Sequence, residues 1–146
     1  MTTTTRNSYG LFLDLPGSVA DWRPRAEAAL KAEGFGILTE IDVQATLRAK
    51  LGEDVPAQVI LGACNPPLAH GAMVAETDIG LLLPCNVTLR ELPPDPTESS
   101  RSVHTRIGIM DIASLMGVIE NPALGPIAEQ VNERLARVLQ ALGNEA

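Results

Sequence analysis

Aromatic side chains are scarce in this chain, whose 146 residues include one Trp, one Tyr and two Phe. Its core must therefore be mainly aliphatic, and a hydrophobic content of 45 % excludes a wholly disordered chain. A chain of this length can bury one substantial core. The apolar runs are far shorter than a membrane span, and no apolar signal segment opens the chain. We therefore expect a cytoplasmic protein with no membrane partner.

Cysteine and positive charge are also in short supply. Two cysteines exclude a disulfide framework and a four-thiolate zinc site, and no Cys-x-x-Cys pair is present. Eleven Lys and Arg against eighteen Asp and Glu give a net charge of −7, which repels nucleic-acid phosphates. A phosphate-binding loop, a nucleophile elbow and a dinucleotide fingerprint are absent too. The sequence thus predicts no metal site and no nucleic-acid partner, and it leaves the cofactor and any enzymatic activity unassigned.

Alternating strands and helices are predicted from the hydrophobic pattern. This order favours an α+β fold, a two-layer α/β sandwich whose mixed sheet of about five strands has helices packed on one face. Residues 1–7 are expected to be a disordered N-terminal tail, and residues 8–146 a single α/β domain. The last helix has an apolar stripe of Leu124, Ile127, Val131, Leu135, Val138 and Leu142. The expected strands are Tyr9–Leu15, Phe35–Ile41, Ala57–Cys64, Ile79–Leu92 and Arg101–Met110, the last two forming a hairpin.

Short polar side chains mark the expected helix starts. Ser18 is a candidate N-cap, with Asp21 three residues later in the position of a capping box. Pro24 fits the first turn if Asp21 is the cap, but it removes an internal hydrogen bond if Ser18 is. Asp42 and Asn65 are the expected caps of the next two helices.

Three segments of the sequence carry a family resemblance. They are Glu33–Asp42, the segment Ile60–Ala69 with its Cys-Asn-Pro, and the segment Ile79–Val87 with its Pro-Cys-Asn. Together they closely resemble the family called domain of unknown function 302, over about residues 20 to 142. The resemblance implies a compact α/β sandwich and a homodimer. The family has no established activity, so the resemblance carries over no catalytic residue.

Cys64 and Asn65 stand where a strand gives way to a helix. The free N–H groups and the dipole of a helix N-terminus favour a thiolate or a bound anion, so Cys64 is a candidate reactive or ligand-contacting residue. The alternative is that Cys64 is a small buried side chain that fills space. Asn65 is explained by helix capping, and as the neighbour of Cys64 it is also a ligand-binding candidate.

Cys85 and Asn86 follow Pro84 inside an expected strand. Pro cannot donate a ladder hydrogen bond, so this point is an edge or a bulge, and bulges often aim side chains at a site. Unbroken alternation places Cys85 on the core face and Asn86 on the opposite face. Asn86 either satisfies a backbone group or faces a ligand.

Three further residues are secondary candidates. His70 follows Cys64 by six residues, and His104 and Arg106 alternate with Val103, Thr105 and Ile107 in the last strand. A polar strand face of that kind is a solvated sheet face, a dimer interface or an anion pocket.

Three functional hypotheses follow from these residues. The leading one is a small homodimeric binding or accessory protein whose pocket, near Cys64, Asn65, Cys85 and Asn86, takes a small anionic or thiol-reactive ligand. The second is a cysteine-dependent enzyme or redox protein that uses Cys64, with a histidine as its base. The third is a purely structural interaction module with both cysteines in the core.

Overall fold

The computed structural model describes residues 3–98 and 102–146. Its strands are β1 (Thr4–Arg6), β2 (Gly10–Pro16), β3 (Gly36–Asp42), β4 (Gln58–Cys64), β5 (Cys85–Glu91) and β6 (His104–Met110). Its α-helices are α1 (Val19–Ala32), α2 (Val43–Leu51), α3 (Pro66–Ala75), α4 (Ile112–Leu115) and α5 (Gly125–Asn144). Two short 3-10 helices, η1 (Ile79–Leu82) and η2 (Pro122–Leu124), precede β5 and α5.

The strands of the described residues form one sheet of order β1-β2-β6-β5-β4-β3, and every neighbouring pair is antiparallel. The predicted fold class is confirmed. The sheet differs from the prediction in having six strands rather than about five and in being antiparallel rather than mixed. The physical reason is that β2 and β3, which α1 connects, lie far apart in the sheet and never pair, so the helical connection creates no parallel ladder.

The sixth strand is β1, which pairs with β2 from Thr4↔Leu13 to Arg6↔Leu11. The prediction of a disordered tail over residues 1–7 is therefore wrong for Thr4–Arg6, and residues 1–2 lie outside the described part of the chain. β1 lies at the edge of the sheet and takes its ladder hydrogen bonds from β2 alone, as a short, exposed edge strand does.

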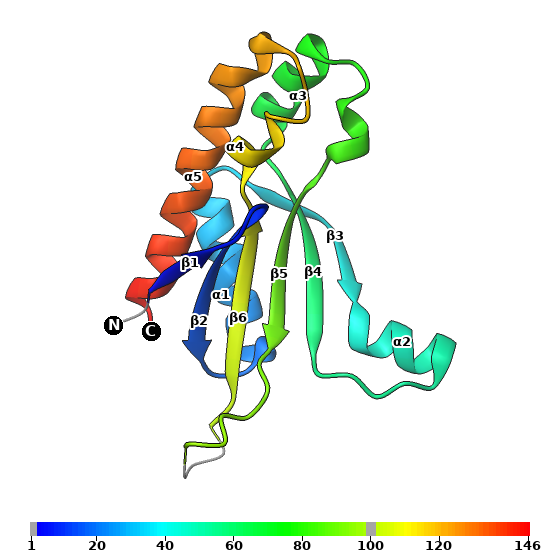
Figure 1. Cartoon of the computed structure of the whole chain (residues 1–146), viewed down its shortest axis with the longest axis vertical. Helices are drawn as coiled ribbons and strands as arrows, with labels where there is room; N and C mark the ends of the chain where they lie inside the picture. Colours follow the sequence, from blue (N-terminus) through cyan, green and yellow to red (C-terminus); the bar gives the residue numbers. More distant parts are fainter. Residues whose placement is uncertain (1–2, 99–101) are drawn as a thin grey trace.

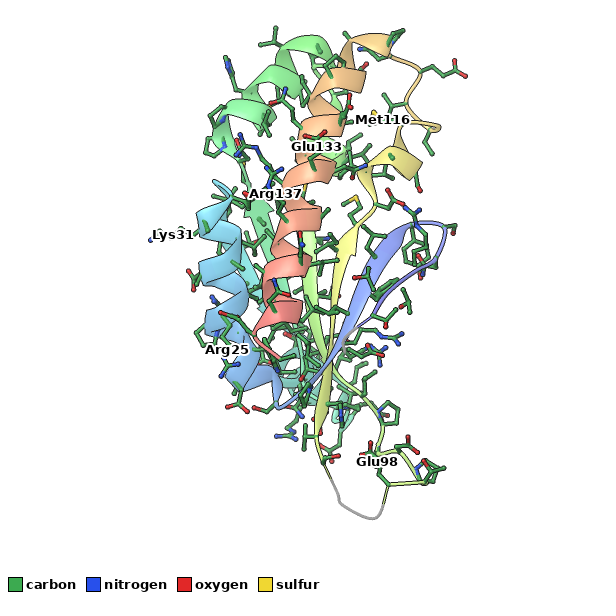
Figure 2. All side chains as sticks on the ribbon, turned by 90° about the vertical axis from the view of Figure 1, so that its left-hand side faces the viewer. Arg25, Lys31, Glu98, Met116, Glu133 and Arg137 are labelled. Atoms are coloured by element: carbon green, nitrogen blue, oxygen red, sulfur yellow. The ribbon has the colours of Figure 1, made fainter. Side chains whose placement is uncertain are left out.

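Helices α1 and α5 cover one face of the sheet (Figure 1). Figure 2 shows this helix layer and the sheet side by side. The main core between them holds Trp22 and Leu30 from α1 and Leu135 and Leu142 from α5, packed on the inward side chains of the strands. In Figure 1, α2 projects beyond the β3 edge, and it has no buried residue. None of the helices in the described residues is long and apolar enough to cross a membrane.

The predicted helix starts are borne out by their hydrogen bonds. The backbone N–H of Asp21 donates to Ser18 Oγ at 3.1 Å, and that of Ser18 donates to Asp21 Oδ2 at 3.1 Å, which is a complete capping box. Ser18 is thus the cap, and Pro24 lies inside α1. Asp42 and Asn65 cap α2 and α3 with their side-chain oxygens.

The predicted strand Ile79–Leu92 is wrong over its first half. Ile79–Leu82 form η1, and β5 begins only at Cys85, after a cis Leu83–Pro84 peptide bond. Because Pro84 has no N–H to donate, the ladder starts after it. Ile79 and Leu83 therefore lie outside the sheet and pack with Ala72 of α3 and Leu124 of η2.

Strand β3 departs from simple alternation as well. Its register with β4 shifts between Ile37 and Thr39, so a bulge separates them. Ile37 packs against the main core, whereas Thr39 lies against Gly62 on the other face, where its hydroxyl occupies the space a Gly62 Cβ would need. Simple alternation along the expected strand Phe35–Ile41 puts Ile37, Thr39 and Ile41 on one face, and this expectation is wrong because the extra residue, Leu38, reverses the alternation.

Candidate functional site

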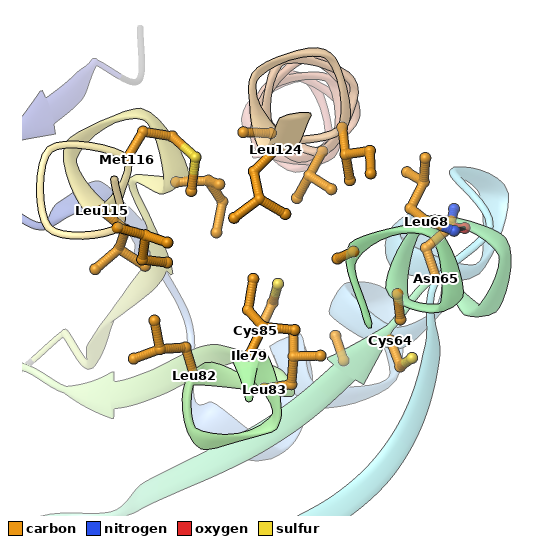
Figure 3. A pocket seen from close by; sticks show the side chains of 18 of the residues that line it. Cys64, Asn65, Leu68, Ile79, Leu82, Leu83, Cys85, Leu115, Met116 and Leu124 are labelled. Atoms are coloured by element: carbon orange, nitrogen blue, oxygen red, sulfur yellow. Dashed lines mark hydrogen bonds between the residues drawn. The ribbon is translucent and has the colours of Figure 1, made fainter. Parts of the chain in front are cut away.

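An apolar cavity of about 70 Å³ lies at the end of the sheet where β4 and β6 finish and β5 begins. Helix α3, η1, α4 and the first turns of α5 surround it (Figure 3). Among the described residues that line it, Asn65 alone carries an oxygen or nitrogen on its side chain, and the others are hydrocarbon, thioether or thiol side chains. The cavity therefore offers apolar contacts and almost no hydrogen-bonding capacity.

The space exists because two cores meet there without filling it. The main core ends at Ala63 and Cys85, and a second small core of Ala72, Ile79 and Leu124 lies between α3, η1 and η2. Four alanines form part of the wall, and their single methyl groups leave volume that larger side chains would occupy. They are Ala63, Ala69, Ala72 and Ala128.

Cys85 is the thiol that points into the cavity (Figure 3). It is 9 % exposed and pairs with Ala63 across β4 and β5, which sets its side chain on the helix face of the sheet. Burial, and to a lesser extent the neighbouring Cys64, raises the pKa of the Cys85 thiol to about 11. The thiol is therefore protonated at neutral pH and forms a small, uncharged part of the wall.

Cys64 and Asn65 lie at the cavity wall, where β4 leads into α3. Cys64 is half-buried, and Figure 3 shows its sulfur turned away from the centre of the cavity. Asn65 is 7 % exposed, and its Oδ1 accepts a hydrogen bond from the Leu68 N–H at 3.3 Å. Its amide nitrogen lies 2.9 Å from where a Cβ of Gly34 would be, and Gly34 has φ +86°, so this close approach requires glycine.

The structure brings together three of the four ligand-binding candidates. Cys64, Asn65 and Cys85 line the cavity, whereas Asn86 is exposed and, by alternation from Cys85, faces the other side of the sheet. Asn86 is thus separated from the other three because neighbouring strand residues point to opposite faces.

The secondary candidates lie elsewhere. His70 is exposed on α3, and His104 is at the start of β6, the end of the strand remote from the cavity. Neither histidine lines the cavity, so neither is placed to act as a base for its thiols. Arg106 forms an ion pair with Asp14. Across residues 3–98 and 102–146, no three His, Cys, Asp or Glu side chains gather in a way that would hold a metal ion.

Most of the cavity wall was not predicted as a site from the sequence. Ile79 and Leu83 were assigned to a strand, and the apolar side chains of α5 to an ordinary helix face. Leu115, Met116 and Ile119 lie around α4 and carry no signal beyond hydrophobicity. Pro84 was the one sequence signal that could have separated the apolar run Ile79–Leu83 from the strand that follows it.

Comparison with known proteins agrees with the fold. The family model described as "Domain of unknown function DUF302" matches residues 13–142. The crystal structure of an uncharacterized conserved protein DUF302 from Bacillus stearothermophilus is similar, with a TM-score of 0.76 and 30 % sequence identity. The match covers 90 % of this chain and 96 % of that one. A search of curated proteins finds no match. The chain therefore belongs to the DUF302 family.

Proposed function

We propose that this protein is a small binding or accessory protein that holds an uncharged apolar ligand in the cavity beside Cys85. The observation that carries this proposal is the lining, which is apolar or thiol at every position except Asn65. A mostly apolar concavity with very few polar groups is typical of small-molecule sites.

The same lining argues against the anionic ligand expected from the helix N-terminus. Within the described part of the chain no Arg, Lys or His lines the cavity, and an anion buried without a partner there costs several kcal/mol. Asn65 already uses its oxygen to cap α3. A thiol-reactive ligand is disfavoured too, because the Cys85 thiol that faces the cavity has its pKa raised to about 11 and is a weak nucleophile.

The size of the cavity limits the ligand. Its volume of about 70 Å³ is roughly half that of the ~150 Å³ engineered cavity that binds benzene. A short alkyl group fits, either as a free molecule or as the end of a longer chain. We therefore propose a short-chain aliphatic compound as the ligand.

Filling the cavity should abolish this binding. Ala72 is 6 % exposed and lines the cavity from α3, so Ala72→Leu places three more carbons in it, at a cost of about 1–3 kcal/mol from overpacking. We expect n-butane to shift the NMR methyl signals of cavity alanines in the natural protein and not in the Ala72→Leu variant.

The matched control is Ala136→Leu, which makes the same change at an exposed position of α5. This variant should respond to n-butane as the natural protein does. Absence of any response in the natural protein, or an unchanged response in Ala72→Leu, would contradict the proposal.

We also propose that the protein works as a homodimer formed through β3 and α2. β3 is an edge strand, and an unpaired edge is self-complementary in a two-fold dimer. Leu38, Ile41 and Leu51 in these elements are 64 %, 49 % and 67 % exposed. The β5–β6 hairpin does not offer such an edge, because both of its strands lie inside the sheet and are paired on both sides.

Native mass spectrometry tests the dimer and retained ligand in one measurement. We expect twice the 15.5 kDa chain mass for the freshly purified protein, and the monomer mass for Ile41→Glu. Leu81→Glu, at a position that is 90 % exposed on η1, should remain dimeric. A monomeric natural protein would disprove the dimer and leave the cavity proposal standing.

A further inference from the structure

The face of the sheet opposite the helices carries a second hollow, of about 360 Å³. We call this face, defined by Phe12, Asp14, Thr88, Arg90 and Arg106, the open face. Tyr9 and Phe12 line the hollow with rings, Thr88 with a hydroxyl, and Arg90 and Arg106 with guanidinium groups. The hollow is polar and lined by arginines, although the chain as a whole has a net charge of −7. Its local charge is therefore opposite in sign to that of the whole molecule.

The pairing of the strands forces two positive charges together there. Arg90 in β5 lies directly opposite Arg106 in β6. Directly opposed side chains of an antiparallel pair are about 4.5–5.5 Å apart at Cβ, and like charges at that spacing are destabilising. The partner of Arg90 on its other side is Gln58 of β4, which carries no charge to compensate.

One carboxylate, that of Asp14, lies near both arginines and is hydrogen-bonded to only one of them. Arg106 donates from Nε to Asp14 Oδ1 at 2.7 Å and from Nη2 to Asp14 Oδ2 at 2.8 Å, a two-pronged ion pair. Arg106 also lies over the Phe12 ring, with 5.6 Å from its Cζ to the ring centroid. Asp14 also attracts Arg90 electrostatically, but among residues 3–98 and 102–146 Arg90 has no hydrogen bond or close ion pair to a carboxylate.

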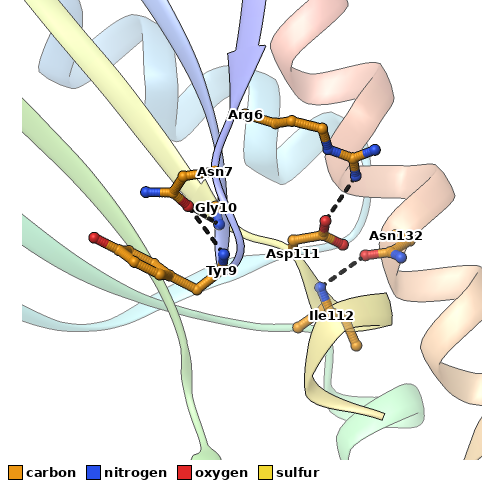
Figure 4. A network of polar contacts seen from close by, with 7 residues as sticks. All are labelled: Arg6, Asn7, Tyr9, Gly10, Asp111, Ile112 and Asn132. Carbon is orange, nitrogen blue, oxygen red and sulfur yellow. Dashed lines mark hydrogen bonds and ion pairs between the residues drawn. The ribbon is translucent and has the colours of Figure 1, made fainter. Parts of the chain in front are cut away.

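The other arginine at the hollow is already engaged. Arg6 Nη2 donates to Asp111 Oδ2 at 2.7 Å. Figure 4 shows this guanidinium and the Tyr9 ring pointing in opposite directions from the β1–β2 turn. Tyr9 is 65 % exposed and lines the hollow, so its ring is accessible to a bound molecule. Arg90 and Arg106 thus share the single carboxylate of Asp14, which leaves one positive charge in excess, and Arg90 is the arginine whose N–H donors no carboxylate occupies.

We propose that the hollow binds a small aromatic carboxylate, whose carboxylate pairs with Arg90 and whose ring packs against Phe12 and Tyr9. A guanidinium matches a carboxylate in shape and offers two parallel N–H donors, and the Thr88 hydroxyl is a further donor on the same strand face. A single negative charge balances the single uncompensated positive charge. This site lies across the sheet from the apolar cavity, so the proposal is independent of the function proposed above.

Benzoate is the probe, and benzamide is its uncharged analogue of the same shape. With NMR titrations of the full chain at constant ionic strength, we expect benzoate to shift signals of Tyr9, Thr88 and Arg90, and benzamide to bind at least tenfold more weakly. Arg90→Gln should raise the Kd of benzoate at least tenfold. Lys31→Gln, which removes the same charge from the exposed side of α1, should change it less than twofold.

Two further measurements exclude unfolding and binding in the apolar cavity as explanations of the result. Arg90→Gln is expected to keep or raise the Tm, because it removes the repulsion from Arg106, so weaker binding cannot be attributed to unfolding. Ala72→Leu should bind benzoate normally, which separates this site from the cavity. Equal losses in Arg90→Gln and Lys31→Gln, equal binding of benzoate and benzamide, or no binding of benzoate by the natural protein would each overturn the proposal.

Discussion

Replacing Leu135 by alanine is expected to lower the free energy of unfolding by about 2–5 kcal/mol. Leu135 is 1 % exposed, at the middle of the apolar face with which α5 packs on the main core. Deleting its three terminal carbons removes buried apolar surface and leaves a cavity that the neighbouring side chains fill only in part. Urea unfolding, with the midpoint and slope compared between variants, measures the loss.

The matched control for Leu135 is Gln140→Ala on the exposed face of α5. It should change stability by less than about 0.5 kcal/mol. The adjacent Arg134 is a poorer control than its sequence position suggests, because its Nη1 donates to the Glu33 carbonyl oxygen at 3.0 Å and so connects α5 to the end of α1. Equal losses in Leu135→Ala and Gln140→Ala would show that the packed face of α5 is misassigned.

Cys64 is expected to react with iodoacetamide at least a hundredfold faster than Cys85 in the folded protein at pH 8. The thiolate is the reactive form, and a Cys85 pKa of about 11 leaves about one thiol in a thousand ionised at that pH. Cys85 is also buried, whereas Cys64 is half-buried beside the N-terminus of α3. Alkylation of Cys85→Ser and Cys64→Ser, each of which retains one thiol, measures the two rates.

The pH dependence of these rates checks the cause. The rate at Cys85 should rise about tenfold per pH unit up to about pH 11, whereas both thiols should react at similar rates in the urea-unfolded chain. Equal native rates, or a faster Cys85, would contradict the assignment of Cys85 to the dry wall of the cavity.

The raised pKa of Cys85 also links stability to pH. An unfolded cysteine ionises near pH 8.5, while folded Cys85 stays protonated up to about pH 11. Above pH 8.5 the folded state therefore binds more protons than the unfolded state, and stability falls as pH rises. The part of the unfolding free energy that depends on a protonated Cys85 is fully present below about pH 8.5 and is lost by about pH 11. The Cys85→Ala variant should therefore lose less stability than the natural protein over this pH range.

The candidate site shows how far sequence reasoning extends. The Cys64–Asn65 helix start and the inward direction of Cys85 follow from capping and alternation, and all three residues line the cavity. The same alternation separates Asn86 from them. The apolar chemistry of the cavity was not predicted, because its wall combines side chains from the sheet, α3, η1, α4 and α5, none of which is unusual alone.

By itself, the sequence of this protein determined the features that arise from interactions between residues a few positions apart. Ser18, Asp42 and Asn65 cap their helices through hydrogen bonds to residues three positions on, and the stripe through Leu135 repeats with the helical turn. The two-layer fold class follows from the same local patterns. These interactions join residues three or four positions apart, so they can be predicted from one short segment of the sequence.

Only the tertiary structure decided which segments meet. The edge strand β1 forms because β2 is there to pair with it, and the bulge at Leu38 reverses the faces of β3 through its register with β4. Arg90 is brought opposite Arg106 by the β5–β6 pairing, and the cavity is the volume left where two cores fail to close. Register and residual volume depend on contacts between residues distant in sequence, and those contacts are set by the packing of the whole domain.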